Sequence, residues 1–82
     1  MLIRSQSLEN LRICLASNVK HYRSKKGVSQ ERTALEAGID RTMLSKIERA
    51  ITNPSLDTLL KLANYLDVTV SELLRENVRT RP

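Results

Sequence analysis

Apolar residues recur at intervals of three and four along the first third of the chain, which is the period of an amphipathic helix. The stripe consists of Leu8, Leu11, Leu15, Val19 and Tyr22. It predicts a helix from Leu8 to about Lys26, and Gly27 directly after two lysines is typical of a helix C-terminus. Residues 1–7 show no clear period, so we expect a tail or a frayed helix start there.

Four further helices follow from the capping residues and from the apolar periods. Ser29, Asp40 and Ser55 offer N-cap oxygens, and Thr69 with Glu72 forms the pattern of a capping box. The predicted helices cover 30–37, about 41–49, 56–66 and 70–74. Five helices with short connections predict a single all-α domain over residues 8–76, followed by a basic tail at 77–82.

The predicted third helix has one apolar face and one polar face. On a helical wheel, Met43, Leu44 and Ile47 point one way, and the opposite arc of about 140° holds Arg41, Thr42, Ser45, Lys46 and Arg49. No acidic residue lies inside that arc, although a solvated surface helix usually mixes its charges. Arg and Lys donate to guanine edges, and Ser and Thr bond several bases. The face therefore favours DNA binding.

The overall charge agrees with an anionic partner but does not identify it. Fourteen Lys and Arg against nine Asp and Glu leave a net charge of +5 on 82 residues. Such a balance favours nucleic acid or an anionic membrane surface. No apolar run is long enough to span a bilayer, and the N-terminus lacks a signal-peptide core. We therefore expect a cytoplasmic protein without a membrane partner.

Catalytic and metal-binding chemistry has few candidates in this chain. Cys14 and His21 are the only residues of their types, so an internal disulfide and a zinc cluster are excluded. Cys14 lies in an apolar stripe and is expected to be a buried thiol. His21 is interpreted as a solvated helix residue, with a phosphate contact as the alternative. We expect no enzymatic activity, no cofactor, no metal and no small-molecule ligand.

Two short helices joined by "AGID", a turn with one glycine, have the length and turn type of a helix-turn-helix. The stretch from about Val19 to Leu74 resembles the phage repressor/Cro (XRE-type) helix-turn-helix domain. The matching positions are Arg23, Gly27, Ser29, Gln30, Ala34, Ala37, Gly38, Leu44, Ile47, Glu48, Arg49, Asn53, Pro54, Ser55 and Leu56. The segment "DRTMLSKIER" also resembles the recognition helix of restriction–modification controller proteins, although prophage repressors and antitoxins share similar stretches.

The resemblance implies a lambda-repressor-like fold and a role for each matching residue. It implies base contacts for Arg41, Thr42, Ser45 and Lys46, phosphate contacts for Gln30, Arg49 and Asn53, and a partly buried ion pair between Arg23 and Glu48. The expected function is a controller-type or repressor-type transcriptional regulator that binds a palindromic double-stranded DNA operator as a homodimer. The alternative is an antitoxin or adaptor module that acts mainly through protein–protein contact.

A dimer interface is expected on the last two helices, because one small module buries too little DNA for tight specific binding. On the wheel of the fourth helix, Leu56, Leu59, Ala63 and Leu66 point inward, Leu62 lies at the flank and Tyr65 points away. The predicted interface consists of Leu62, Tyr65, Val70, Leu73 and Leu74.

Three positions depart from the family pattern. Thr33 replaces the usual Leu, and its buried hydroxyl would need a partner such as the carbonyl four residues back. Leu35 replaces a polar residue, which indicates either a rotated or loosely packed second helix or a simply exposed side chain. Ala50 replaces Gly after the third helix and would cost about 1 kcal/mol in a left-handed backbone.

Overall fold

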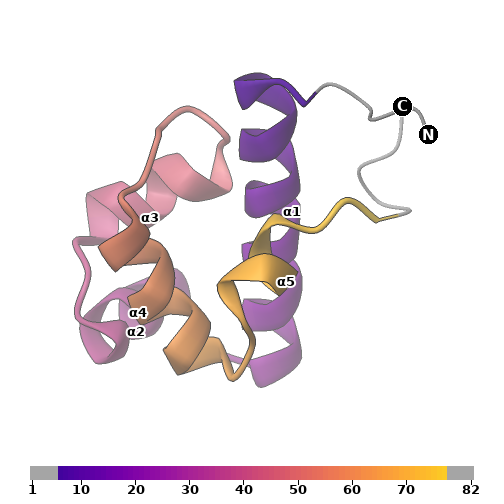
Figure 1. The fold of residues 1–82 in the computed structure, drawn as a ribbon. Coiled ribbons are helices and arrows are strands. Elements are labelled where there is room, and N and C mark those ends of the chain that lie inside the picture. Colours follow the sequence, from indigo (N-terminus) through magenta and orange to yellow (C-terminus); the bar gives the residue numbers. More distant parts are fainter. Residues whose placement is uncertain (1–5, 78–82) are drawn as a thin grey trace.

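The computed structural model describes residues 6–77, which form five α-helices and, within that range, no strand. The helices are α1 (Leu8–Lys26), α2 (Gln30–Ala37), α3 (Arg41–Glu48), α4 (Leu56–Leu66) and α5 (Val70–Leu74) (Figure 1). The all-α, five-helix prediction is confirmed, with α3 ending one residue earlier than expected. Most residues of the two predicted tails, 1–7 and 77–82, lie outside the described range.

Local hydrogen bonds set the helix boundaries. Ser29, Asp40, Ser55 and Thr69 each accept a bond from the backbone N–H three residues on, and Thr69 and Glu72 complete a capping box. Ser7, which lies in the predicted tail, caps α1 in the same way. Gly27 and Gly38 end α1 and α2 at φ 75° and 77°, a left-handed backbone that glycine adopts at low cost.

An aliphatic core lies between the helices. Its buried members are Leu15, Val19, Ala34, Leu44, Ile47, Leu59, Leu62, Ala63, Leu66 and Leu73. The expectation that Leu56 points inward is wrong, since its side chain is 78% exposed. Leu62 takes that place and is fully buried, so the inward face of α4 is turned toward Leu62.

A buried asparagine ties the last helix to the first. The side-chain amide of Asn18 on α1 donates to the carbonyl oxygens of Leu73 at 2.9 Å and Arg75 at 2.8 Å. These carbonyls lie at the end of α5, where a helix leaves acceptors without internal partners. Asn18 thereby fixes α5 against α1. Cys14 on the same helix is buried, as expected.

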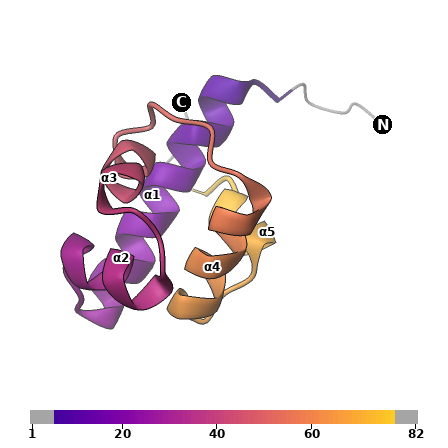
Figure 2. The ribbon, with the colours of Figure 1, turned by 90° about the vertical axis from the view of Figure 1, so that its left-hand side faces the viewer.

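The long helix α1 contacts most of the other helices. It packs against α3, α4 and α5, while α2 packs against α3 and α4. Figure 2 shows α3 and α5 on opposite sides of α1. The outer surfaces of α3 and α5 can therefore contact different partners at once.

Within the described residues, no helix is long and apolar enough to cross a membrane.

The three departures from the family pattern have different outcomes. Thr33 is fully buried, and its hydroxyl finds no partner with good hydrogen-bond geometry among the described residues, so the expected carbonyl partner is wrong. Leu35 is simply exposed, at 80%, beside the buried Thr33 and Ala34. Ala50 keeps a left-handed backbone at φ 60°, a conformation that L residues with a Cβ disfavour.

Candidate nucleic-acid interface

The polar face of α3 points into solvent. Arg41, Thr42, Lys46 and Arg49 are exposed and Ser45 is half-buried. On the opposite side of the helix, Leu44 and Ile47 are buried in the core. The apolar anchors thus hold α3 so that three cations and two hydroxyls face outward from one surface, which we call the α3 face (Arg41, Thr42, Ser45, Lys46 and Arg49).

A buried carboxylate fixes the C-terminal end of α3. Glu48 Oε2 accepts from Arg23 Nε at 2.7 Å, and Glu48 Oε1 accepts from Arg23 Nη2 at 3.0 Å. The Glu48 side chain is only 4% exposed and that of Arg23 is 21% exposed. The hydrogen bond to Glu48 raises the pKa of Arg23 above its ordinary value. The ion pair implied by the resemblance is therefore present and joins α1 to α3.

Gln30, an expected phosphate contact, also bonds to this carboxylate. Its side-chain Nε2 donates to Glu48 Oε1 at 2.9 Å, so α2 is held to α3 through the same group. One amide hydrogen of Gln30 is therefore already used inside the protein. Gln30 is the first residue of α2, and the N–H groups of a first turn have no acceptor within their helix. Its backbone N–H is the better candidate for a phosphate contact.

Two contacts shape the segment after α3. Arg49 Nε donates back to the Ser45 carbonyl at 3.3 Å, which leaves both terminal nitrogens of the guanidinium for other acceptors. Asn53 Oδ1 accepts from Arg12 Nε at 2.7 Å, so α1 holds the side chain for which the resemblance implies a phosphate contact. Arg12 has no local signal in the sequence, because its partner lies 41 residues away and no pattern connects the two.

One acidic side chain reaches the α3 face from α2. Glu31 Oε2 lies 4.0 Å from Arg41 Nη1, and both side chains are more than two-thirds exposed. Exposed pairs of this kind contribute at most about 1 kcal/mol. Arg41 can leave Glu31 for a stronger acceptor at little cost.

The residues expected at a dimer interface divide into two groups. Leu62 and Leu73 are fully buried inside the protomer, so their assignment to an interface is wrong. Both side chains are needed to close the small core, which leaves nothing of them for a partner. Val70, Leu74 and Tyr65 are partly buried and pack against the core with one side. Their interface role stays a prediction.

Tyr65 has several partners within the protomer. Its hydroxyl donates to Glu36 Oε1 at 2.5 Å, and Lys26 Nζ lies 4.5 Å from the ring centroid. The bond to Glu36 raises the pKa of Tyr65, while the nearby Thr33 hydroxyl lowers it. The same bond, helped by Arg32, lowers the pKa of Glu36. These contacts join α2, α1 and α4 at the end of the domain.

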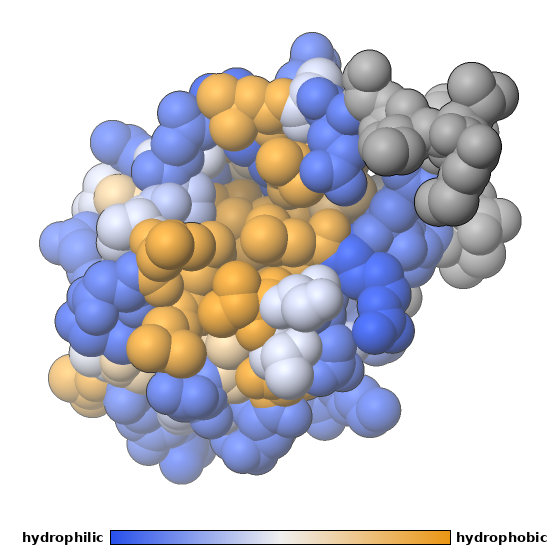
Figure 3. Space-filling view, in the orientation of Figure 1, coloured by the Kyte–Doolittle hydropathy of each residue, from blue (hydrophilic) through white to orange (hydrophobic). Residues whose placement is uncertain are grey.

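A continuous apolar surface covers the side of the domain that carries α4 and α5 (Figure 3). Leu56 and Leu60 on α4 are 78% and 52% exposed. Beside them runs a groove of about 190 Å³ lined by Leu8, Leu11, Leu15, Thr52, Pro54, Leu59 and Leu74, with Arg12 and Asn53 at its polar edge. Leu8, expected in the first apolar stripe, is 53% exposed and belongs to this surface.

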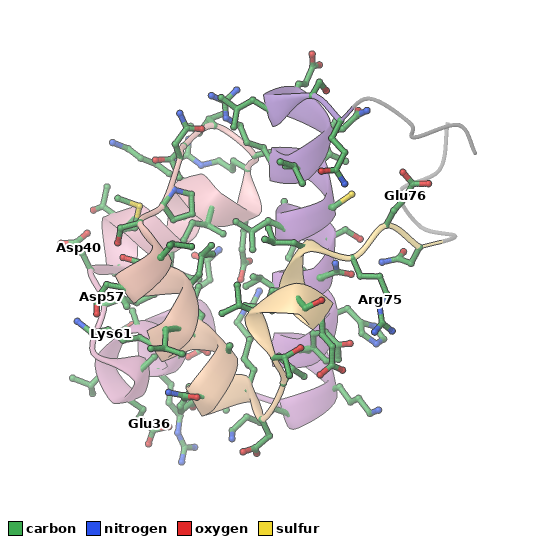
Figure 4. All side chains as sticks on the ribbon, viewed as in Figure 1. Glu36, Asp40, Asp57, Lys61, Arg75 and Glu76 are labelled. Atoms are coloured by element: carbon green, nitrogen blue, oxygen red, sulfur yellow. The ribbon has the colours of Figure 1, made fainter. Side chains whose placement is uncertain are left out.

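Charged residues border this surface. Figure 4 shows Asp57 and Lys61 at one edge of α4 and shows Arg75 and Glu76 after α5, on the other side of the view. Asp57 and Lys61 pair at 3.2 Å. An apolar centre with a polar border is the usual anatomy of a protein interface. We call this surface, represented by the exposed Leu56 and Leu60 and the partly buried Val70 and Leu74, the α4–α5 face.

Comparison with known proteins agrees with this geometry. The helix-turn-helix family model matches residues 19–73. The transcriptional regulator SinR of Bacillus subtilis is 42% identical over 67 residues, which are 80% of this chain and 60% of SinR. This chain therefore spans less than two-thirds of SinR, as it does of the SinR relative from Bacillus licheniformis.

Solved structures show the same fold. The crystal structure of a hypothetical transcription factor from Neisseria has a TM-score of 0.80 at 34% identity, covering 96% of this chain and 91% of that one. The restriction–modification controller protein C.AhdI of Aeromonas hydrophila has a TM-score of 0.71 at 37% identity, covering 76% and 94%.

These relatives are named as transcriptional regulators and a controller protein, not as enzymes, which agrees with the expectation from the sequence. Among the described residues, no group of three or more His, Cys, Asp or Glu side chains could hold a metal ion. The family match covers α2 and α3 completely and extends into α5. The chain therefore belongs to the XRE-type helix-turn-helix family.

Proposed function

We propose that this protein is a sequence-specific transcriptional regulator that places α3 in the major groove of duplex DNA. The observation that carries the proposal is the α3 face, with three exposed cations and no acidic residue from its own helix. Such groups match the donors and acceptors on base edges. The buried anchors Leu44 and Ile47 hold the helix in one orientation, which base reading requires.

Base reading belongs to Arg41, Thr42, Ser45 and Lys46, and positioning on the backbone belongs to Gln30, Arg49 and Asn53. The hydrogen bonds that Arg23 and Gln30 donate to Glu48 support this assignment of base and phosphate contacts, because they fix the start of α2 relative to the end of α3. A phosphate bound at the first turn of α2 then sets the depth at which α3 enters the groove. Binding to DNA also agrees with the expected cytoplasmic location.

The proposed assembly is a homodimer on a palindromic operator, formed through the α4–α5 face. Two observations support it: Leu56 and Leu60 are exposed one helical turn apart on α4, and α5 lies on the opposite side of α1 from α3. A dimer joined there presents two α3 helices to half-sites spaced by about one turn of DNA. If the α4–α5 face instead contacts a different protein, the molecule is the antitoxin or adaptor type.

Selection of bound sequences from a random duplex pool, followed by titration of the selected duplex at rising salt, tests the function. We expect affinity to fall by at least about a thousandfold between 50 and 200 mM salt, because several phosphates are neutralised. A scrambled duplex of the same length is the control and should bind at least about a thousandfold more weakly at physiological salt. Failure to enrich any sequence, with no duplex bound at low salt, would reject DNA binding in favour of the adaptor.

A further inference from the structure

A second open groove runs beside the α3 face. It has a volume of about 860 Å³ and lies between α1 and the end of α3. Its polar lining consists of Ser17, Lys20, His21, Ser24, Glu48 and Arg49. The α1 residues among these recur every three or four positions, so they share one side of the helix and extend along about 10 Å of it.

The charge in this groove is positive and uncompensated. Lys20, His21 and Arg49 are exposed, and neither Lys20 nor Arg49 forms an ion pair within the described part of the chain. The one acid in the lining, Glu48, is 4% exposed and its carboxylate already accepts from Arg23 and Gln30. The groove therefore attracts an anion.

The shape of the groove favours an extended polyanion over a small one. Small-molecule sites are concave and bury most of the ligand. Here the groove is open along the side of α1, and its cations and hydroxyls lie beside the apolar side chains of Ile13, Ala16 and Ala50. Arg49 belongs both to this groove and to the α3 face. Because Arg49 and Lys20 line the same groove, an extended polyanion bound along α3 can reach both.

We propose that this groove holds the phosphate backbone of the DNA that flanks the bases read by α3. Lys20 supplies the main charge, and His21 and Ser24 donate hydrogen bonds to phosphate oxygens. The inference rests on the proposed function and extends it: the protein contacts more of the duplex than its reading helix covers. These contacts carry no sequence information, so they add affinity without specificity.

Two duplexes test the inference with the full chain. One is trimmed to the bases that the protein protects most strongly, and the other carries one further helical turn on each side. For the unaltered protein, we expect tighter binding to the longer duplex. Lys20→Ala should weaken binding to the longer duplex by about 3- to 10-fold. It should also lower the slope of log affinity against log salt concentration by about one unit per bound protomer. Its effect on the trimmed duplex should be less than twofold.

Lys25→Ala is the matched control. Lys25 is exposed on the same helix and carries the same charge, but it lines a different groove with Tyr22, Lys26 and Val68. Equal losses for Lys20→Ala and Lys25→Ala, or equal losses on both duplexes, would show that only net charge matters and would overturn the inference. If the unaltered protein binds no duplex, the proposed function fails with it. If it binds and Lys20→Ala has no effect, only the groove assignment fails.

A titration with inorganic phosphate distinguishes a binding site for the DNA backbone from a small-anion site. Binding is followed by NMR through the ring signals of His21. We expect only weak, unsaturated shifts at millimolar phosphate. Saturation at low millimolar phosphate, without any difference between the two duplexes, would identify a small-anion site and overturn the DNA assignment.

Discussion

Arg23 on α1 and Glu48 at the end of α3 form a two-point ion pair, with Nε–Oε2 and Nη2–Oε1 distances of 2.7 and 3.0 Å. Glu48 directly precedes Arg49, and Gln30 shares its carboxylate. Arg23 also donates through Nη1 to the Val28 carbonyl at 2.9 Å. The pair therefore fixes three segments at once: the end of α1, the start of α2 and the end of the proposed reading helix.

The first prediction is that removal of either partner destabilises the fold. Arg23→Ala and Glu48→Ala should each lower the free energy of unfolding by about 3 kcal/mol, because each leaves a largely buried charge unpaired. Chemical denaturation of both single variants and the double variant gives their coupling energy, which should exceed about 1 kcal/mol. Arg32→Ala is the control, since its pair with Glu36 is exposed and should contribute at most about 1 kcal/mol. A coupling energy near zero would mean that the two charges act independently.

The second prediction concerns the dimer. Leu60→Glu should convert the protein to a monomer in sedimentation equilibrium while its helicity is retained, because Leu60 is 52% exposed in the protomer and is not needed for its core. Burying a carboxylate against the apolar surface of a partner is costly. Operator binding should weaken with the loss of the second half-site.

Leu35→Glu provides the matched control for that experiment. Leu35 is also an exposed leucine, at 80%, but it lies on α2 and outside the α4–α5 face. We expect its variant to keep the mass of the unaltered protein. A dimer mass retained by Leu60→Glu would place the interface elsewhere on the surface.

The third prediction concerns the buried hydroxyl of Thr33. Thr33→Val should raise the free energy of unfolding by about 1 kcal/mol, because it replaces an unsatisfied polar group by a methyl of similar size. Thermal unfolding measures the change, with Thr33→Ser as the comparison that keeps the hydroxyl. Destabilisation by Thr33→Val would show instead that the hydroxyl bonds in solution, with the Tyr65 hydroxyl as its nearby candidate.

Local signals in the sequence were sufficient to predict the helices. Ser29, Asp40 and Ser55 act within three residues of themselves, so their caps need no knowledge of the rest of the fold. The two faces of α3 were also predictable, because its polar and apolar residues separate cleanly on the wheel. The structure places both faces as that separation indicates.

Long-range packing accounts for what the sequence could not predict. The leucines of α4 span an arc of about 160° on the wheel, with Leu62 at one edge and Leu56 toward the other. The wheel alone does not decide which edge is buried, and packing against α1, α2 and α5 settles it. The bond between Arg12 and Asn53 joins residues from different helices and loops, and the amide of Gln30 finds Glu48 only after α2 and α3 have packed. Such partners depend on the tertiary structure.

Base reading by α3 is the central claim, and the ratio of affinities for operator and scrambled duplex tests it most directly. We expect Lys46→Ala to lower the free-energy difference that corresponds to this ratio by about 1–3 kcal/mol, because a good base contact is lost. Arg49→Ala should weaken both duplexes alike and lower the salt slope by about one unit, as expected for a phosphate contact. If Lys46→Ala also weakens both duplexes equally, and Arg41, Thr42 and Ser45 variants do the same, α3 does not read bases and its cations form only an electrostatic patch.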